Sequence, residues 1–104
     1  MAFVGGGYHR AGLHSVLEPA VFGVPVTFGP GWGMSRDASL LLERGAAVAL
    51  PGPAAARRAL LSQWLVWHHD RSVRDAAGEA ALDVVRAGRG AAERTTALVQ
   101  ELVR

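Results

Sequence analysis

A glycine-rich segment near the N-terminus carries the residue types best suited to holding a ligand. The apolar residues 2–4 predict a short buried strand, which runs directly into Gly5, Gly6 and Gly7. In α/β proteins, a glycine-rich turn after such a strand presents backbone N–H groups to a phosphate. The alternative is a tight turn that needs glycine for its positive φ angles, and the sequence leaves both interpretations open.

A serine and a glutamate three residues apart follow this segment. Ser15 and Glu18 stand at the start of a helix expected over residues 16–22, and Gly12 and His14 come just before it. The spacing is that of a capping box, in which both side chains bind backbone amides of their own helix. In the alternative, Glu18 accepts hydrogen bonds from the two hydroxyls of a ribose while the helix start faces a phosphate.

Two common phosphate-binding motifs are excluded by the same segment. Gly7 and Gly12 have the spacing of a P-loop, but Leu13 and His14 stand where that motif requires Lys and Ser or Thr. Arg10 occupies the place of the third glycine of a dinucleotide-binding fingerprint. What remains is a glycine-rich turn at the end of a strand, with Arg10 as a candidate contact for an anion.

Composition narrows the class of protein. The 104 residues are 50% hydrophobic and 19% charged, which predicts one small globular domain. The net charge is +2, and the positively charged residues are spread along the expected helices rather than clustered. Nucleic acid is therefore not an expected partner. The chain has no cysteine, and its four histidines lack the spacing of a zinc site, so we expect no metal and no cofactor. Without a long apolar run or a basic leader, a cytoplasmic location is expected.

The elements that must position the glycine-rich segment alternate between strands and helices. Three apolar segments predict strands over residues 2–4, 24–28 and 46–50. A helix between the last two strands begins at Ser35 or Asp37, ends at Leu42 and is followed by Gly45. This order favours an α/β fold with a parallel sheet of three strands covered on both faces, resembling the second half of a doubly wound, Rossmann-like domain cut from a larger protein.

The remainder of the chain is expected to be helical. Trp64 and Trp67 lie one turn apart and are predicted to anchor the core or a domain interface. A stripe of small apolar residues follows from Val73 onward at helical spacing. Gly88 and Gly90 predict a break in this stripe and a separate last helix after it.

Several segments of the chain, in order, resemble the 3-deoxy-D-manno-octulosonic acid (Kdo) transferases. The strongest match is Leu-Glu-Pro-Ala at residues 17–20, with Gly-Val-Pro-Val at 23–26 and Gly-Pro at 29–30. Further matching segments are residues 3–6, 12–16, 41–47 and 89–95. The resemblance covers nearly the whole chain.

This resemblance implies a glycosyltransferase of the GT-B class, which has two Rossmann-like domains and a donor cleft between them. Such an enzyme transfers Kdo from CMP-Kdo to the lipid A precursor, as a peripheral protein on the cytoplasmic face of the bacterial inner membrane, without a catalytic metal. Residues 1–104 would be the C-terminal portion, which binds the nucleotide. Glu18 would contact the ribose, and the Gly5-Gly6 loop and Ser15 would lie against the nucleotide.

One departure from the family concerns a residue and another concerns length. The family commonly has asparagine where this chain has Ser15, whose side chain reaches less far. The catalytic base of the family lies in the N-terminal domain, so we expect no catalytic residue and no transferase activity in this chain alone. Two alternatives stay open: another GT-B enzyme that uses a UDP-sugar, and a non-catalytic module that binds a nucleotide or docks through an exposed strand edge.

Overall fold

The computed structural model describes residues 1–9 and 12–103, and it contains the predicted alternation of short strands and helices. The strands are β1 (Ala2–Val4), β2 (Val26–Phe28) and β3 (Ala47–Ala49). The helices are α1 (Leu17–Ala20), α2 (Arg36–Glu43), α3 (Pro53–His69) and α4 (Arg71–Leu102). All three predicted strands are present, although β2 and β3 are shorter than predicted.

The strands form one parallel sheet, as the sequence predicted, and their order in it is β1-β2-β3. Ala2 lies opposite Val26, which in turn lies opposite Ala47. Thr27 is fully buried, and its hydroxyl donates a hydrogen bond to the carbonyl oxygen of Ala2 at 2.9 Å. This bond supplements the backbone pairing of the N-terminal strand and leaves no polar group unpaired at Thr27.

The core lies on one face of the sheet. The inward side chains of the three strands form a cluster with buried residues from α1, α2 and α4, which are Val4, Val26, Phe28, Ala47, Ala20, Ala38, Leu41, Ala81 and Val84. Phe3 alternates with these residues and shares the opposite face with Thr27 and Val48. Phe3 is 45% exposed, so the predicted cover on the second face is incomplete at β1.

The second helix follows its sequence signals closely. Ser35 is the N-cap residue of α2, and its Oγ accepts a hydrogen bond from the N–H of Ala38 at 3.1 Å. At the other end, Gly45 adopts a φ of 72° directly after the C-cap residue Arg44, as is typical of a helix stop. Both predicted signals are confirmed, with Ser35 rather than Asp37 as the cap.

The first helix does not begin with a capping box. Its N-cap residue is Val16, and no side chain of residues 1–9 or 12–103 caps the helix through a hydrogen bond. Val16 is only 2% exposed, so burial of this side chain in the core determines where α1 starts. Ser15 therefore lies one residue too early to act as the cap. The helix has four residues rather than the seven predicted.

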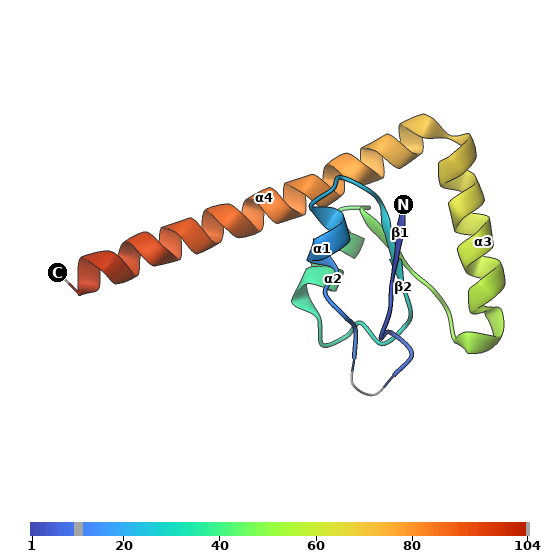
Figure 1. Cartoon of the computed structure of the whole chain (residues 1–104), viewed down its shortest axis with the longest axis horizontal. Helices are drawn as coiled ribbons and strands as arrows, with labels where there is room; N and C mark the ends of the chain where they lie inside the picture. The colour runs from blue at the N-terminus through green and yellow to red at the C-terminus, as the bar shows by residue number, and fades with distance from the viewer. Residues whose placement is uncertain (10–11, 104) are drawn as a thin grey trace.

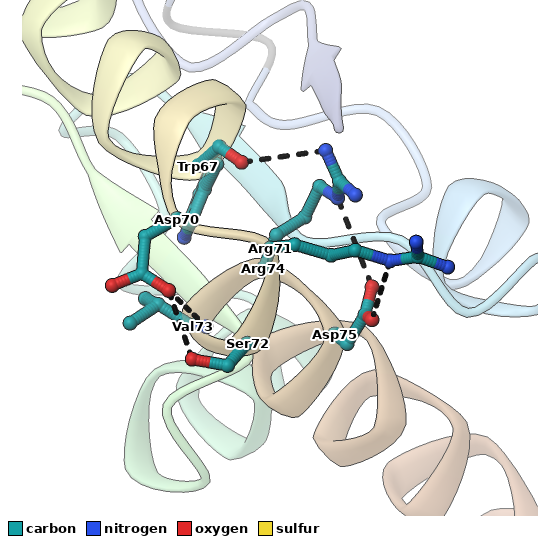
Figure 2. Close-up of polar contacts among 7 residues, drawn as sticks. All are labelled: Trp67, Asp70, Arg71, Ser72, Val73, Arg74 and Asp75. Carbon is teal, nitrogen blue, oxygen red and sulfur yellow. Dashed lines mark hydrogen bonds and ion pairs between the residues drawn. The ribbon is translucent and has the colours of Figure 1, made fainter.

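A polar corner joins α3 to α4 (Figure 2). Asp70 Oδ1 accepts hydrogen bonds from the Val73 amide at 3.1 Å and from the Ser72 hydroxyl at 2.8 Å. These two bonds hold the pKa of Asp70 below its ordinary value, because they stabilise the carboxylate. Arg74 donates to the carbonyl oxygen of Trp67 at 3.5 Å across the same corner.

The two tryptophans of α3 differ in burial. Trp67 is 2% exposed, which confirms the prediction of a core anchor. Trp64 is partly buried, and its Nε1 has no hydrogen-bond partner among the residues that the structure describes.

The last helix is continuous, so the predicted break at Gly88 and Gly90 is wrong. α4 runs without interruption from Arg71 to Leu102. A glycine lowers helix stability by only about 1 kcal/mol relative to alanine, and it keeps its N–H group for the helix hydrogen bond. The alanine and arginine residues on both sides favour the helix strongly enough to offset this cost. The C-terminal half of α4 extends far beyond the sheet and its helices (Figure 1). The molecule is accordingly elongated, with extents of 56 × 34 × 17 Å.

Candidate nucleotide site

The loops that follow β1 and β2 touch at the carboxyl edge of the sheet. The N–H of Gly31 donates to the carbonyl oxygen of Gly7 at 2.7 Å. A Cβ atom added at Gly7 would lie 2.7 Å from the nitrogen of Gly29, and one added at Gly31 would lie 2.6 Å from the Gly7 oxygen. These glycines are therefore needed for close backbone approach, which no other residue type permits.

Tyr8 connects these loops to the end of β3. Its ring packs on Gly29, where an added Cβ would lie 2.5 Å from the ring carbon Cε2. Its hydroxyl donates to the carbonyl oxygen of Pro51, just beyond β3, at 2.8 Å. Tyr8 thus joins the carboxyl ends of all three strands. Sequence reasoning missed this residue, because its partner lies 43 positions away.

The segment around the first glycines folds back on itself. The N–H of His14 donates to the carbonyl oxygen of Gly5 at 3.0 Å, and the His14 ring lies over Gly5 and Gly6. Gly6 and Gly12 have φ angles of 91° and 89°, so the tight-turn interpretation is correct at these two positions. The structure therefore brings together Gly5, Gly6, Gly12 and His14. Arg10, the candidate anion contact, lies outside the described residues.

A shallow pocket of about 360 Å³ lies between the two glycine-rich loops. The described residues that line it are His9, Gly12 and Leu13 from the first loop and Gly31, Gly33, Met34 and Ser35 from the second. Among the described residues that were predicted to bind the nucleotide, only Gly12 lines this pocket. The helix that begins at it is α2, whose N-cap residue is Ser35, and not α1 as the sequence suggested.

Glu18 and Ser15 lie outside this pocket. Both side chains are exposed, and Glu18 makes no side-chain hydrogen bond or ion pair with any residue in the described ranges. With four residues, α1 is too short for its peptide dipoles to sum to a substantial helix dipole.

The sequence did contain a signal that the second loop resembles the first. The glycines of residues 29–33 precede Ser35 as those of residues 5–12 precede Ser15.

A second groove, of about 730 Å³, lies where α4 leaves the body of the protein. Its apolar walls include Leu17, Leu40 and Val84, and the guanidinium-bearing residues Arg36 and Arg89 also line it. No sequence motif predicted this groove, since it depends on how α2 and α4 pack.

Within residues 1–9 and 12–103, no group of three or more His, Cys, Asp or Glu side chains is placed to hold a metal ion. No helix in these ranges has both the length and the apolar character needed to cross a membrane.

Comparisons of the chain with protein-family models, with curated proteins and with solved structures found no match.

Proposed function

We propose that this chain is the donor-binding part of a GT-B glycosyltransferase of the Kdo transferase family, and that its donor is CMP-Kdo. The observation that carries the proposal is the meeting of two glycine-rich loops around a pocket of about 360 Å³ at the carboxyl edge of a parallel sheet. Ligands of open α/β sheets bind at this edge. The volume is also within the range of pockets that hold small molecules.

The pocket offers backbone donors for the phosphate of the donor. Ser35, which lines the pocket, occupies the Ala38 amide, and the next two amides of α2, those of Arg36 and Asp37, have no partner among the described residues. Gly31 and Gly33 line the pocket beside this turn and have no side chains that would keep a phosphate away. An anion at this position is favoured by the positive end of the α2 dipole.

The absence of a capping box supports a ligand role for Glu18. Its carboxylate is exposed and has no partner among the described residues, so both oxygens can accept hydrogen bonds from vicinal hydroxyls. In the proposed complex the phosphate lies at the start of α2 and the ribose extends from the pocket towards Glu18 on α1. The Gly5-Gly6 loop, over which the His14 ring lies, and Ser15 would then lie against the nucleotide; for the loop and Ser15 this is what the family resemblance implies.

The chemistry that follows from this proposal is a direct displacement. An acceptor hydroxyl of the lipid A precursor forms a bond to the anomeric carbon of Kdo, the bond to the phosphate breaks, and CMP leaves. Backbone donors at α2 stabilise the charge on the leaving phosphate. The base that takes the hydroxyl proton belongs to the N-terminal domain of the family, at the cytoplasmic face of the inner membrane. We therefore expect no CMP-Kdo turnover by the 104-residue chain.

Calorimetric titration of the full chain with CMP, CMP-Kdo and UDP tests the choice of nucleotide. We expect CMP to bind at least about tenfold more tightly than UDP, a difference of about 1.4 kcal/mol. A preference for UDP would favour a different GT-B enzyme. Failure of all three ligands to bind would favour a module without nucleotide chemistry.

The role of Glu18 is tested by Glu18→Gln, which keeps the size of the side chain and removes its charge. We expect about tenfold weaker CMP binding, because a carboxylate accepts stronger hydrogen bonds from hydroxyls than an amide does. Glu43→Gln is the matched control, since Glu43 is also exposed but lies at the far end of α2. Equal loss in both variants, or no loss in either, would contradict the assignment.

A further inference from the structure

The face of α4 that packs on the body continues past the edge of the body. Ala77, Ala81 and Val84 are buried on this face, at alternating spacings of four and three residues. The same alternation continues along the exposed half of the helix, through Gly88 and then through Ala91, Thr95, Leu98 and Leu102. We name these last four residues the outer stripe. Its two leucines, Leu98 and Leu102, are 61% and 85% exposed.

The outer stripe has the properties of a helix-packing surface. Its residues continue an alternation of four and three residues, the heptad spacing at which two helices remain in contact along their length. Thr95, its one polar member, donates its hydroxyl to the carbonyl oxygen of Ala91 at 3.0 Å, so it can be buried without an unpaired donor. The stripe is graded in size, with Ala91 and Thr95 nearer the body and the leucines nearer the end.

We propose that the outer stripe is a self-association surface, and that its occupant is the same stripe of a second copy, packed antiparallel. A two-fold axis midway between residues 95 and 98 places Ala91 against the partner's Leu102 and Thr95 against the partner's Leu98. Every layer then pairs a small residue with a leucine. Such an interface is isologous and closes at two copies.

The residues beside the stripe select the antiparallel orientation. Arg94 and Glu101 each directly precede a stripe residue, Thr95 and Leu102, and so lie on the same flank of the helix. In an antiparallel pair these flanks face each other, and Arg94 of each copy meets the partner's Glu101. In a parallel pair the same flank would face Ala92 and Val99, which leaves both charges beside apolar residues.

The opposite flank also fits the antiparallel pair. There Ala92 meets the partner's Val99, again a small residue against a larger one, and Val99 is 53% exposed in the single chain. Because this half of α4 continues a helix whose first half is fixed in the core, little order has to be gained on association. The partner's helix would end near Ala91, beside the groove at which α4 leaves the body.

Sedimentation equilibrium of the full chain tests the surface first. We expect a dimer, and we expect Leu98→Asp to raise the dissociation constant at least about tenfold because it places a carboxylate in the central layer. Ala97→Asp is the matched control, since it adds the same charge one position away on the exposed side of the helix and should leave the dissociation constant unchanged. Both positions are exposed, so each variant should retain the circular dichroism of the parent. A wild-type chain that stays monomeric at millimolar concentration overturns the proposal and leaves the stripe to a different partner.

A charge-reversal pair tests the orientation. Arg94→Glu makes both facing positions acidic in a homodimer, and Glu101→Arg makes both basic, so each variant alone should dimerise less than the wild type. An equimolar mixture should form a heterodimer, because each acidic position then faces a basic one. A mixture that associates no better than the separate variants contradicts the antiparallel pairing.

Cross-linking tests the register. The natural chain has no cysteine, so a single introduced thiol is unique. In the proposed register a mixture of Ala91→Cys and Leu102→Cys cross-links on mild oxidation, whereas each variant alone does so poorly. Efficient self-cross-linking of either variant alone would show a parallel dimer and overturn the arrangement.

Discussion

The two halves of α4 belong to one uninterrupted helix but have opposite environments. Residues 71–86 contain all the buried positions of the helix, which are Ala77, Gly78, Ala81 and Val84. None of residues 87–102 is buried. Both halves nevertheless repeat the same stripe of small and apolar residues at helical spacing. A periodic pattern thus predicts a helix and the face that can be covered, but it does not predict whether the same chain covers it.

Residues 71–86, the packed half of α4, depend on tertiary contacts that residues 87–102, the outer half, lack. Gly78 lies directly against the carbonyl oxygen of Gly23, in the turn after α1. At Gly88, by contrast, none of the described residues lies within 4 Å of the position that a Cβ would occupy. Isolated helices of this length are marginally stable in water, so the outer half is held by its continuity with the packed half and by any helix that covers its stripe.

The largest expected effect comes from placing a charge in each half. Ala81 is fully buried among core residues, so Ala81→Asp should lower the free energy of unfolding by about 3 kcal/mol or more, enough to unfold much of a small domain. Ala97→Asp, in the exposed half, should change it by no more than about 0.5 kcal/mol. Urea unfolding followed by circular dichroism measures both. Similar shifts in the two variants would show that the halves do not differ as described.

A smaller effect, with opposite signs, is expected from replacing a glycine in each half. Gly78→Ala brings a methyl group against the Gly23 carbonyl oxygen and should destabilise the fold by about 1–3 kcal/mol, despite the better helix propensity of alanine. Gly88→Ala meets open space and should stabilise the helix by about 0.5–1 kcal/mol. Thermal unfolding shows whether each variant is less or more stable than the wild type. Stabilisation by both would mean that α4 does not lie close against the turn at Gly23.

The features that could be predicted from the sequence are those with local causes. The strands follow from short apolar runs bounded by glycine and proline, and α2 follows from Ser35 at its start and Gly45 after its end. The burial of Trp67 follows from its position on the inner face of α3. Each of these depends on residues only a few positions apart.

The features that could not be predicted depend on competition between distant contacts. The start of α1 is decided by the burial of Val16, which outweighs the capping pattern of Ser15. Gly88 and Gly90 suggested a break, but their cost is too small to interrupt the helix. At the candidate site, the two loops are joined by the contact of Gly7 with Gly31, 24 positions along the chain, so neither loop alone predicts that they meet around one pocket. The roles of Glu18 and Ser15 stay predictions.

The smallest effect concerns the two ends of α4, of which only the first has a side-chain cap within the described part of the chain. Asp70 accepts hydrogen bonds from Val73 and Ser72, whereas at the other end the Val103 amide simply continues the helix pattern to Val99. Because those bonds lower the pKa of Asp70 in the folded state below its ordinary value of 3.8, the unfolded chain binds the proton more readily. The stabilisation is therefore fully present well above pH 3.8 and is lost as the pH falls through the folded-state pKa.

Asp70→Asn separates capping from titration, because asparagine also caps helices but carries no charge. We expect the melting temperature of the wild type to fall more steeply than that of Asp70→Asn as the pH is lowered from neutrality through the titration of Asp70. Ser72→Ala removes one of the two hydrogen bonds that stabilise the carboxylate, so it should move the pKa of Asp70, measured by NMR titration, back towards 3.8. If the melting temperatures of the wild type and Asp70→Asn fall in parallel as the pH is lowered, the charge of Asp70 does not stabilise residues 71–86 of α4. The difference between the two halves would then come from the buried stripe of the first half alone.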